Sequence, residues 1–233
     1  SRIFRSSRIP YFLLTDPRYI AHYRPLIDRN AGMTAINWHN HFSSVPIDAV
    51  FLNRKREGPL LSPFYPDADL FALSAYRSEF ASRCTGDVVV RQGYGWGTEP
   101  PRQELEDWHK DKLDRFNMRT RFMSGFENTH QPDYISEKIF DAFATGAVPL
   151  YMASPAHSVF RMIGSQGWLN FRDKLPDVPV FDARQPVDLR VSEGFVETQR
   201  ALARLFHDQR VIEAEYDRLW DTVVEELSFI AQS

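Results

Sequence analysis

The chain has 233 residues, of which 43% are hydrophobic, and carries a net charge of −3 at pH 7. That length is enough for a substantial core in one large or two small domains. The near-neutral charge argues against non-specific nucleic-acid binding, which requires a clustered basic surface.

The first predicted elements are short strands. Ile9–Leu14 (IPYFLL) reads as a buried strand that ends in a turn at Thr15–Arg18, and Ala35–Phe42 reads as another strand. In an extended chain His39 and His41 lie on the same side. No further ligand follows them at a usual spacing, and the only cysteine is Cys84, so we predict neither a metal site nor a disulfide.

A proline- and glycine-containing stretch, Asn53–Asp69, is the best candidate for a linker, and it divides the chain into regions 1–62 and 63–233. Within it, Asp67–Asp69 has the Asp-x-Asp pattern of metal-dependent nucleotide-sugar transferases. Because this pattern lies in a proline-rich turn, we interpret it as a solvated turn instead.

The chain after the linker alternates short apolar runs with helical patterns. Leu70–Cys84 predicts a strand and a helix that begins near Ser74, and Asp87–Gly97 predicts a strand that enters a glycine-rich turn. Arg102–Asn117 predicts a charged helix packed loosely on the surface, and Arg210–Ile230 an amphipathic terminal helix. This alternation predicts an α/β fold with a mainly parallel sheet, and no apolar run is long enough to predict a membrane span.

One stretch reads as a complete strand, loop, helix and strand. Arg121–Phe126 is the first predicted strand, and Val148–Met152 is the second. Between them, Ser136 is the expected N-cap of a helix, and Gly146 is placed to end that helix in a left-handed conformation. In such a unit the two strands run parallel, so the loop after the first strand and the helix N-terminus face one crevice.

The charges at this predicted helix start fit an anionic ligand. A helix N-terminus offers unpaired N–H groups and positive potential, and Lys138 adds a full positive charge. The carboxylate of Glu137 can accept hydrogen bonds from sugar hydroxyls. The alternative for Glu137 and Lys138 is a solvated ion pair on a surface helix.

Three linked motifs occur in this stretch: Phe126–Asn128 (FEN), Tyr134–Lys138 (YISEK) and Gly146–Pro149 (GAVP). Together they resemble the donor-binding signature of glycosyltransferase family 10, the inverting α-1,3/4-fucosyltransferases. The resemblance implies a GT-B-like arrangement of two Rossmann-like domains. Region 63–233 would be the donor domain, and region 1–62 a partial, shortened N-terminal α/β domain on the acceptor side.

The resemblance also implies a reaction and roles for single residues. L-fucose would pass from GDP-fucose to a saccharide hydroxyl with inversion, without a required divalent metal and without a tightly bound cofactor. Asp16 would be the general base, and Glu137 and Lys138 would act on the donor. The remaining donor contacts would be Arg77, with Arg83 as second choice, and Asn128 and Tyr134.

The expected partners and setting follow from the same resemblance. The acceptor would be an oligosaccharide or a lipopolysaccharide-type glycan, and nucleic acid would not be a partner. The protein would be a bacterial enzyme of glycan biosynthesis or protein glycosylation, cytoplasmic, and peripheral to the inner membrane. Two alternatives stay open: a non-catalytic module that binds nucleotide sugars or carbohydrates, and a transferase that uses another GDP-deoxysugar.

Overall fold

The computed structural model describes residues 2–97 and 104–232. These residues form an α/β fold, as predicted, around a five-stranded parallel sheet. The helices are α1 Tyr11–Leu14, α2 Arg18–Ala31, α3 Ala35–Ser44, α4 Ser74–Arg83, α5 Trp108–Phe116, α6 Lys138–Thr145, α7 Val159–Met162, α8 Leu189–His207 and α9 Gln209–Gln232. The strands are β1 Ile47–Leu52, β2 Phe64–Tyr65, β3 Leu70–Ala72, β4 Cys84–Thr85, β5 Val89–Gln92, β6 Thr120–Ser124, β7 Thr129–His130, β8 Val148–Tyr151, β9 Leu169–Asn170 and β10 Phe181–Asp182.

The central sheet has the strand order β5-β1-β6-β8-β9. All its neighbouring strands pair in parallel, with Val50 of β1 opposite Val90 of β5, and Phe122 of β6 opposite Val148 of β8. In chain order this is 2-1-3-4-5, one of the common doubly wound arrangements. The connections diverge at β1 and β6, and ligands of such sheets bind in the crevice outside the carboxyl ends of those strands.

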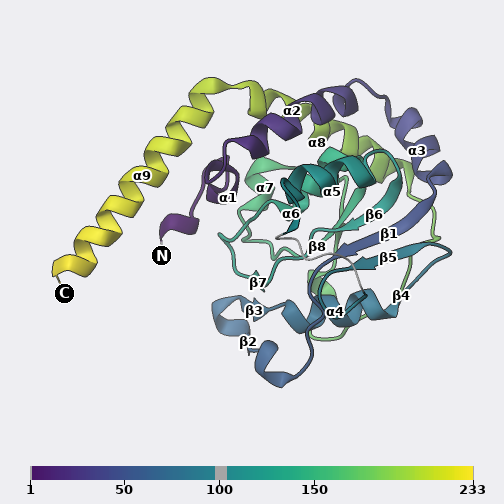
Figure 1. Cartoon of the computed structure of the whole chain (residues 1–233), viewed down its shortest axis with the longest axis horizontal. Helices are drawn as coiled ribbons and strands as arrows, with labels where there is room; N and C mark the ends of the chain where they lie inside the picture. The colour runs from purple at the N-terminus through teal and green to yellow at the C-terminus, as the bar shows by residue number, and fades with distance from the viewer. Residues whose placement is uncertain (1, 98–103, 233) are drawn as a thin grey trace.

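Helices cover both faces of the sheet, with α4 on one side and α2, α5, α6 and α8 on the other (Figure 1). On the α4 side, Phe80 packs against Phe51 of β1 and Phe126 after β6, with ring centroids 6.1 and 5.0 Å apart. On the other side, the carbonyl of Phe143 in α6 accepts hydrogen bonds from Asn30 of α2 and Gln199 of α8. Buried side-chain amides therefore fix α6 between the sheet and the outer helices.

The predicted strand, loop, helix and strand unit is confirmed as β6, α6 and β8. Gly146 ends α6 in the left-handed region with φ 78°, where a Cβ would lie 2.9 Å from the sulfur of Met118 and 3.0 Å from the ring of Trp38. The prediction of Ser136 as the N-cap is wrong, because α6 begins at Lys138 with Glu137 in the N-cap position. The hydroxyl and N–H of Ser136 bind a carboxylate instead.

The two strands predicted near the N-terminus are helical. Ile9–Leu14 contains the short helix α1, which begins at Tyr11 after an extended Pro10 and buries Leu13 and Leu14. Ala35–Phe42 lies in α3, which begins at a capping box formed by Thr34 and Asn37. Short apolar runs carry no strong preference between strand and helix, so packing decided these two segments.

In α3 the two histidines point to different partners. His39 Nδ1 lies 3.1 Å from the carbonyl oxygen of Val187, whereas the ring of His41 lies against Trp38 at 5.2 Å between centroids. The expectation that His39 and His41 share one side of a strand is therefore wrong.

Segment Asn53–Asp69 connects β1 to β3 and contains β2 and two short 3-10 helices. Strand β1 of the central sheet precedes the predicted boundary at 62/63, and the other four strands of that sheet follow it. Asp67 is exposed, whereas Asp69 is 3.1 Å from Arg172 and 3.3 Å from His130. The solvated-turn interpretation therefore holds for Asp67 but not for Asp69.

Helix α5 is more firmly packed than predicted. Of segment Arg102–Asn117, residues 102–103 lie outside the described residues, and the helix spans Trp108–Phe116. His109, Leu113 and Phe116 are buried, and His109 contacts Asp141 of α6. Loose packing was expected because the segment is rich in charged residues. However, His109 and Lys112 of this segment bind the buried carboxylate of Asp141.

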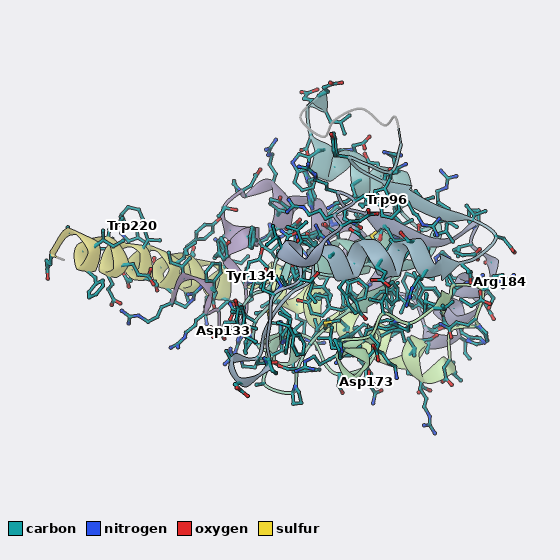
Figure 2. All side chains as sticks on the ribbon, turned by 90° about the horizontal axis from the view of Figure 1, so that it is seen from below. Trp96, Asp133, Tyr134, Asp173, Arg184 and Trp220 are labelled. Atoms are coloured by element: carbon teal, nitrogen blue, oxygen red, sulfur yellow. The ribbon has the colours of Figure 1, made fainter. Side chains whose placement is uncertain are left out.

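Helix α9 confirms the predicted terminal helix and extends away from the sheet (Figure 1). Trp220 on this helix is 70% exposed and lies far from the body of the protein (Figure 2). Near the start of the chain, Arg2 forms an ion pair with Glu225, and Ser7 and Arg8 donate to Glu215. None of the helices in the described ranges is long and apolar enough to cross a membrane.

Candidate functional site

The candidate site lies where β1 and β6 end and where the N-termini of α4 and α6 meet them. Arg77 of α4 donates to the carbonyl of Phe126, directly after β6, over 3.5 Å. The carbonyl of Asn128 accepts a hydrogen bond from the N–H of Leu73, at the start of α4, over 2.9 Å. These contacts hold both helix starts against the loop after β6, at the carboxyl edge predicted for a ligand.

Four residues at this edge form what we call the Lys138 cluster: Glu127, Ser136, Glu137 and Lys138. One carboxylate oxygen of Glu127 accepts from the N–H of Ser136 at 2.7 Å, and the other from its hydroxyl at 2.6 Å. The ammonium group of Lys138 lies 2.7 Å from the Ser136 hydroxyl, 3.2 Å from Glu127 and 3.3 Å from Glu137. Lys138 is therefore held between two carboxylates.

Burial and charge shift the pKa values in this cluster in different directions. Burial raises the pKa of Glu127, against the opposing effect of Lys138. Burial would also raise the pKa of Glu137, but Lys138 and Lys112 hold it below its usual value. Although burial opposes its charge, both glutamates raise the pKa of Lys138, so its ammonium group stays protonated at neutral pH.

Arg77 is the arginine that the structure brings to this cluster. It is only 6% exposed, its Nε has no hydrogen-bond partner, and the charges of Glu127, Glu137 and Tyr134 act on it. Arg83, the second choice, lies at the other end of α4, where it binds the carbonyl of Val178 and the carboxylate of Glu79. The structure therefore favours Arg77 over Arg83 as a ligand contact.

Tyr134 lies beside the Lys138 cluster in a group of aromatic rings from the N-terminal segment. The rings of Phe4 and Phe12 each lie 5.6 Å from that of Tyr134, and Tyr11 packs on Phe12 at 4.2 Å. Figure 2 shows Tyr134 near the place where α9 leaves the body of the protein. Burial, together with the charges of Tyr134, Glu127 and Glu137, raises the pKa of Tyr11 to about 12.

Asn128 and Asp16 are placed differently from the other predicted residues. Asn128 has an exposed side chain and holds the start of α4 through its backbone carbonyl. Asp16 lies in the turn between α1 and α2, where Arg18 donates to both of its carboxylate oxygens and lowers its pKa. The carboxylate of Asp16 pairs with Arg18, its carbonyl accepts from the N–H of Tyr19, and no hydrogen bond or ion pair in the described part of the chain connects Asp16 to the Lys138 cluster.

A second buried group of charges lies one turn further along α6; we call it the Asp141 network, of Tyr23, His109, Lys112 and Asp141. One oxygen of Asp141 lies 2.7 Å from the Tyr23 hydroxyl and 2.8 Å from Nε2 of His109, and Lys112 binds the other oxygen. Burial opposes the charge of Asp141, but Lys112 and His109 lower its pKa to about 2. The Tyr23 hydroxyl also lies 3.4 Å from the carbonyl of Glu137.

The sequence did not indicate that Tyr11 lies near Tyr134, or that Glu127 is the acceptor that orients Ser136 and Lys138. The FEN motif contains Glu127 and could have indicated it, whereas no local signal marks Tyr11. The remaining chemistry of the site is plain: protonated Lys138 and Arg77 can stabilise phosphate charge, and carboxylates can bind hydroxyls. Within residues 2–97 and 104–232, no three potential metal-ligating side chains of His, Cys, Asp or Glu come together.

Residues 87–174 match a known protein family, glycosyltransferase family 10 (fucosyltransferase), in its C-terminal part. The matched segment contains β5, β6, α6 and β8, and with them the whole Lys138 cluster. Arg77 and Tyr11 precede it. No curated protein matches the chain.

Two solved structures are similar to the chain at low identity. One is a crystal structure of alpha1,3-fucosyltransferase with GDP-fucose, with 20% sequence identity and a TM-score of 0.37. The other is a crystal structure of alpha1,3-fucosyltransferase, with 18% identity and a TM-score of 0.34. Each alignment covers 77% of this chain but only 39% and 38% of the respective structures, so the chain spans about two fifths of their length.

Proposed function

We propose that this chain belongs to glycosyltransferase family 10 and contains the donor-binding part of a fucosyltransferase. The Lys138 cluster carries this proposal. It lies inside the segment that matches the family, at the carboxyl edge of a parallel sheet, where doubly wound proteins bind nucleotides. The proposed donor is GDP-fucose, and the proposed product is a fucosylated saccharide.

Charge development on the leaving group explains why Lys138 and Arg77 matter. As the bond between fucose and GDP breaks, negative charge grows on the diphosphate. Positive groups fixed in advance in a partly water-excluded site lower this barrier more than mobile ones in solvent. Glu127 and Ser136 fix the ammonium group of Lys138, and the Phe126 carbonyl contacts one nitrogen of Arg77.

The other predicted residues complete the proposal. Glu137 binds ribose hydroxyls through its ionised carboxylate, and Tyr134 and Asn128 lie toward the fucose and phosphate side. Asp16 takes the proton of the acceptor hydroxyl while that oxygen attacks the anomeric carbon, which inverts its configuration and releases GDP. For this step the carboxylate of Asp16 has to separate from Arg18, which holds it at 2.7 Å.

From the resemblance, we also propose the setting of this reaction. The enzyme would be bacterial, form α-1,3 or α-1,4 linkages on an oligosaccharide or lipopolysaccharide-type glycan, and require no divalent metal. It would work in the cytoplasm at the inner membrane surface.

The direct test is calorimetric binding of GDP-fucose, GDP, GDP-mannose and UDP, combined with an assay of transfer and of hydrolysis. We expect the guanine nucleotides to bind and UDP not to bind. Equal competition by GDP-mannose would favour a transferase of another GDP-sugar. Binding without transfer or hydrolysis would favour a non-catalytic module, and failure of every guanine nucleotide to bind would refute the proposal.

Lys138→Ala sharpens this test. We expect it to lower the transfer rate about a hundredfold, which corresponds to roughly 3 kcal/mol of transition-state stabilisation. Lys110→Ala is the matched control, since Lys110 pairs with an aspartate on the exposed side of α5. Circular dichroism verifies folding of both variants. Full transferase activity of folded Lys138→Ala would exclude the proposed function of this residue.

A further inference from the structure

A second arginine, Arg56, lies beside Arg77 at the carboxyl edge of the sheet. Arg56 belongs to the loop after β1, and its N–H donates to the hydroxyl of Ser78 in α4 over 2.9 Å. Arg77 is the neighbour of Ser78, and it reaches the carbonyl of Phe126 after β6. Both arginines therefore belong to the connection from β1 to β5, and Arg77 reaches across to the loop after β6.

The Nε atoms of both arginines are buried and have no hydrogen-bond partner. Leaving a charged donor unpaired inside a protein is more costly than leaving a neutral donor unpaired. The two positive charges are also close enough to interact: burial lowers the pKa of Arg77, Glu127 raises it, and Arg56 lowers it. Without a ligand, the buried donors of both arginines remain unpaired.

Other arginines show that this condition is unusual in the described part of the chain. Buried unpaired nitrogen atoms also occur in Arg172 and Arg218, but these pair with Asp69 and Glu215. Arg121 donates to Asp48 and to two carbonyl oxygens. Among the described residues, neither Arg56 nor Arg77 has a carboxylate within ion-pair distance.

We propose that Arg56 and Arg77 together bind one phosphate group of a nucleoside diphosphate, while Lys138 binds the other. Guanidinium groups offer paired N–H donors that match phosphate oxygens. A phosphate between the two arginines would pair the free Nε donors and cancel the repulsion. This inference rests on the proposed donor site and adds Arg56 and a preference for diphosphates over monophosphates.

The test compares GDP, GMP, guanosine and inorganic pyrophosphate by calorimetry on the whole chain. We expect Arg56→Gln to weaken GDP and pyrophosphate about tenfold, or about 1.4 kcal/mol, and to leave guanosine unchanged. The substitution should weaken the binding of GMP less than the binding of GDP. The ratio of the affinities for GDP and GMP should therefore fall. Arg56→Lys should restore only part of the affinity, because an ammonium group lacks the paired donors.

Arg54→Gln is the matched control, since Arg54 stands two residues away in the same loop but lies exposed over the ring of Tyr94. It should bind every probe as the wild type does. Folded Arg56→Gln that binds GDP and pyrophosphate as tightly as the wild type would overturn the inference. So would a wild-type protein that binds neither probe.

The outcomes also separate this inference from the proposed function. If pyrophosphate binds in an Arg56-dependent way but nucleotides of every base bind equally and no fucose is transferred, the phosphate site stands and the fucosyltransferase proposal fails. If GDP-fucose is bound and transferred equally well by wild type and Arg56→Gln, the proposed function stands and the assignment of Arg56 fails.

Discussion

Two buried groups of charges share the beginning of α6, and they differ in whether the charged side chains beside them are paired. In the Asp141 network, the carboxylate binds Tyr23, His109 and Lys112. Beside the Lys138 cluster, Arg77 keeps a buried donor without a partner, and so does Arg56 next to Arg77. Buried charge is costly unless it is paired. We therefore interpret the Asp141 network as a structural anchor, and we propose that the side with the unpaired arginine donors binds the ligand.

Among the tests of this contrast, Asp141→Ala should cause the largest loss of unfolding free energy. Removing one partner of a buried ion pair leaves Lys112 without the carboxylate that it binds, which costs about 3–5 kcal/mol of unfolding free energy. Urea unfolding followed by circular dichroism measures the loss. Asp182→Ala, which removes the exposed partner of Arg184, should leave the unfolding midpoint nearly unchanged. A loss at Asp141 no larger than at Asp182 would contradict an anchoring function.

The next effect concerns the dependence of stability on pH. The pKa of Asp141 is about 2 in the folded protein and usually 3.8, so its ionised form favours folding above pH 3.8. This contribution, about 2 kcal/mol, is lost as the pH falls from 3.8 toward 2. Urea unfolding at a series of pH values should show that Asp141→Asn removes most of this acid-induced loss.

Glu127 should behave in the opposite direction. Burial raises its pKa above the usual 4.5, so it favours folding below pH 4.5 and loses that contribution as the pH rises through the raised pKa. Glu127→Gln should therefore reduce the loss of stability that occurs as the pH rises above 4.5. If Asp141→Asn and Glu127→Gln changed the pH dependence of the unfolding free energy in the same direction, the two groups of charges would not differ as described.

A smaller effect is expected from Tyr23→Phe, which deletes only the hydroxyl bound to Asp141 at 2.7 Å. A hydrogen bond to a charged group is worth about 1.5–3 kcal/mol, and we expect the lower end because His109 and Lys112 remain. Chemical unfolding measures this loss. Tyr216→Phe on α9 is the control, since residue Tyr216 is 37% exposed. A loss as large as that of Asp141→Ala would mean that Tyr23 also supports α6 in another way.

The central unit of β6, α6 and β8 could be read from the sequence because several local signals agree there. A buried strand, a turn-rich loop, an apolar helix face and a glycine at the helix end each predict the same arrangement. Ile9–Leu14 and Ala35–Phe42 had only short apolar runs, and both proved helical. The structure also placed Arg77, rather than Arg83, at the site, because only the start of α4 faces the loop after β6.

By itself, the sequence determined the α/β class, the parallel β6–β8 unit and the position of Glu137 and Lys138 at the start of its helix. These features depend on residues near one another in the chain, where periodicity and turn chemistry act. Only the tertiary structure placed Arg56 beside Arg77, Tyr11 near Tyr134, and Lys112 on Asp141. Those pairs join distant segments or the faces of different elements, and packing of helices on the sheet decides which charges share one low-dielectric environment.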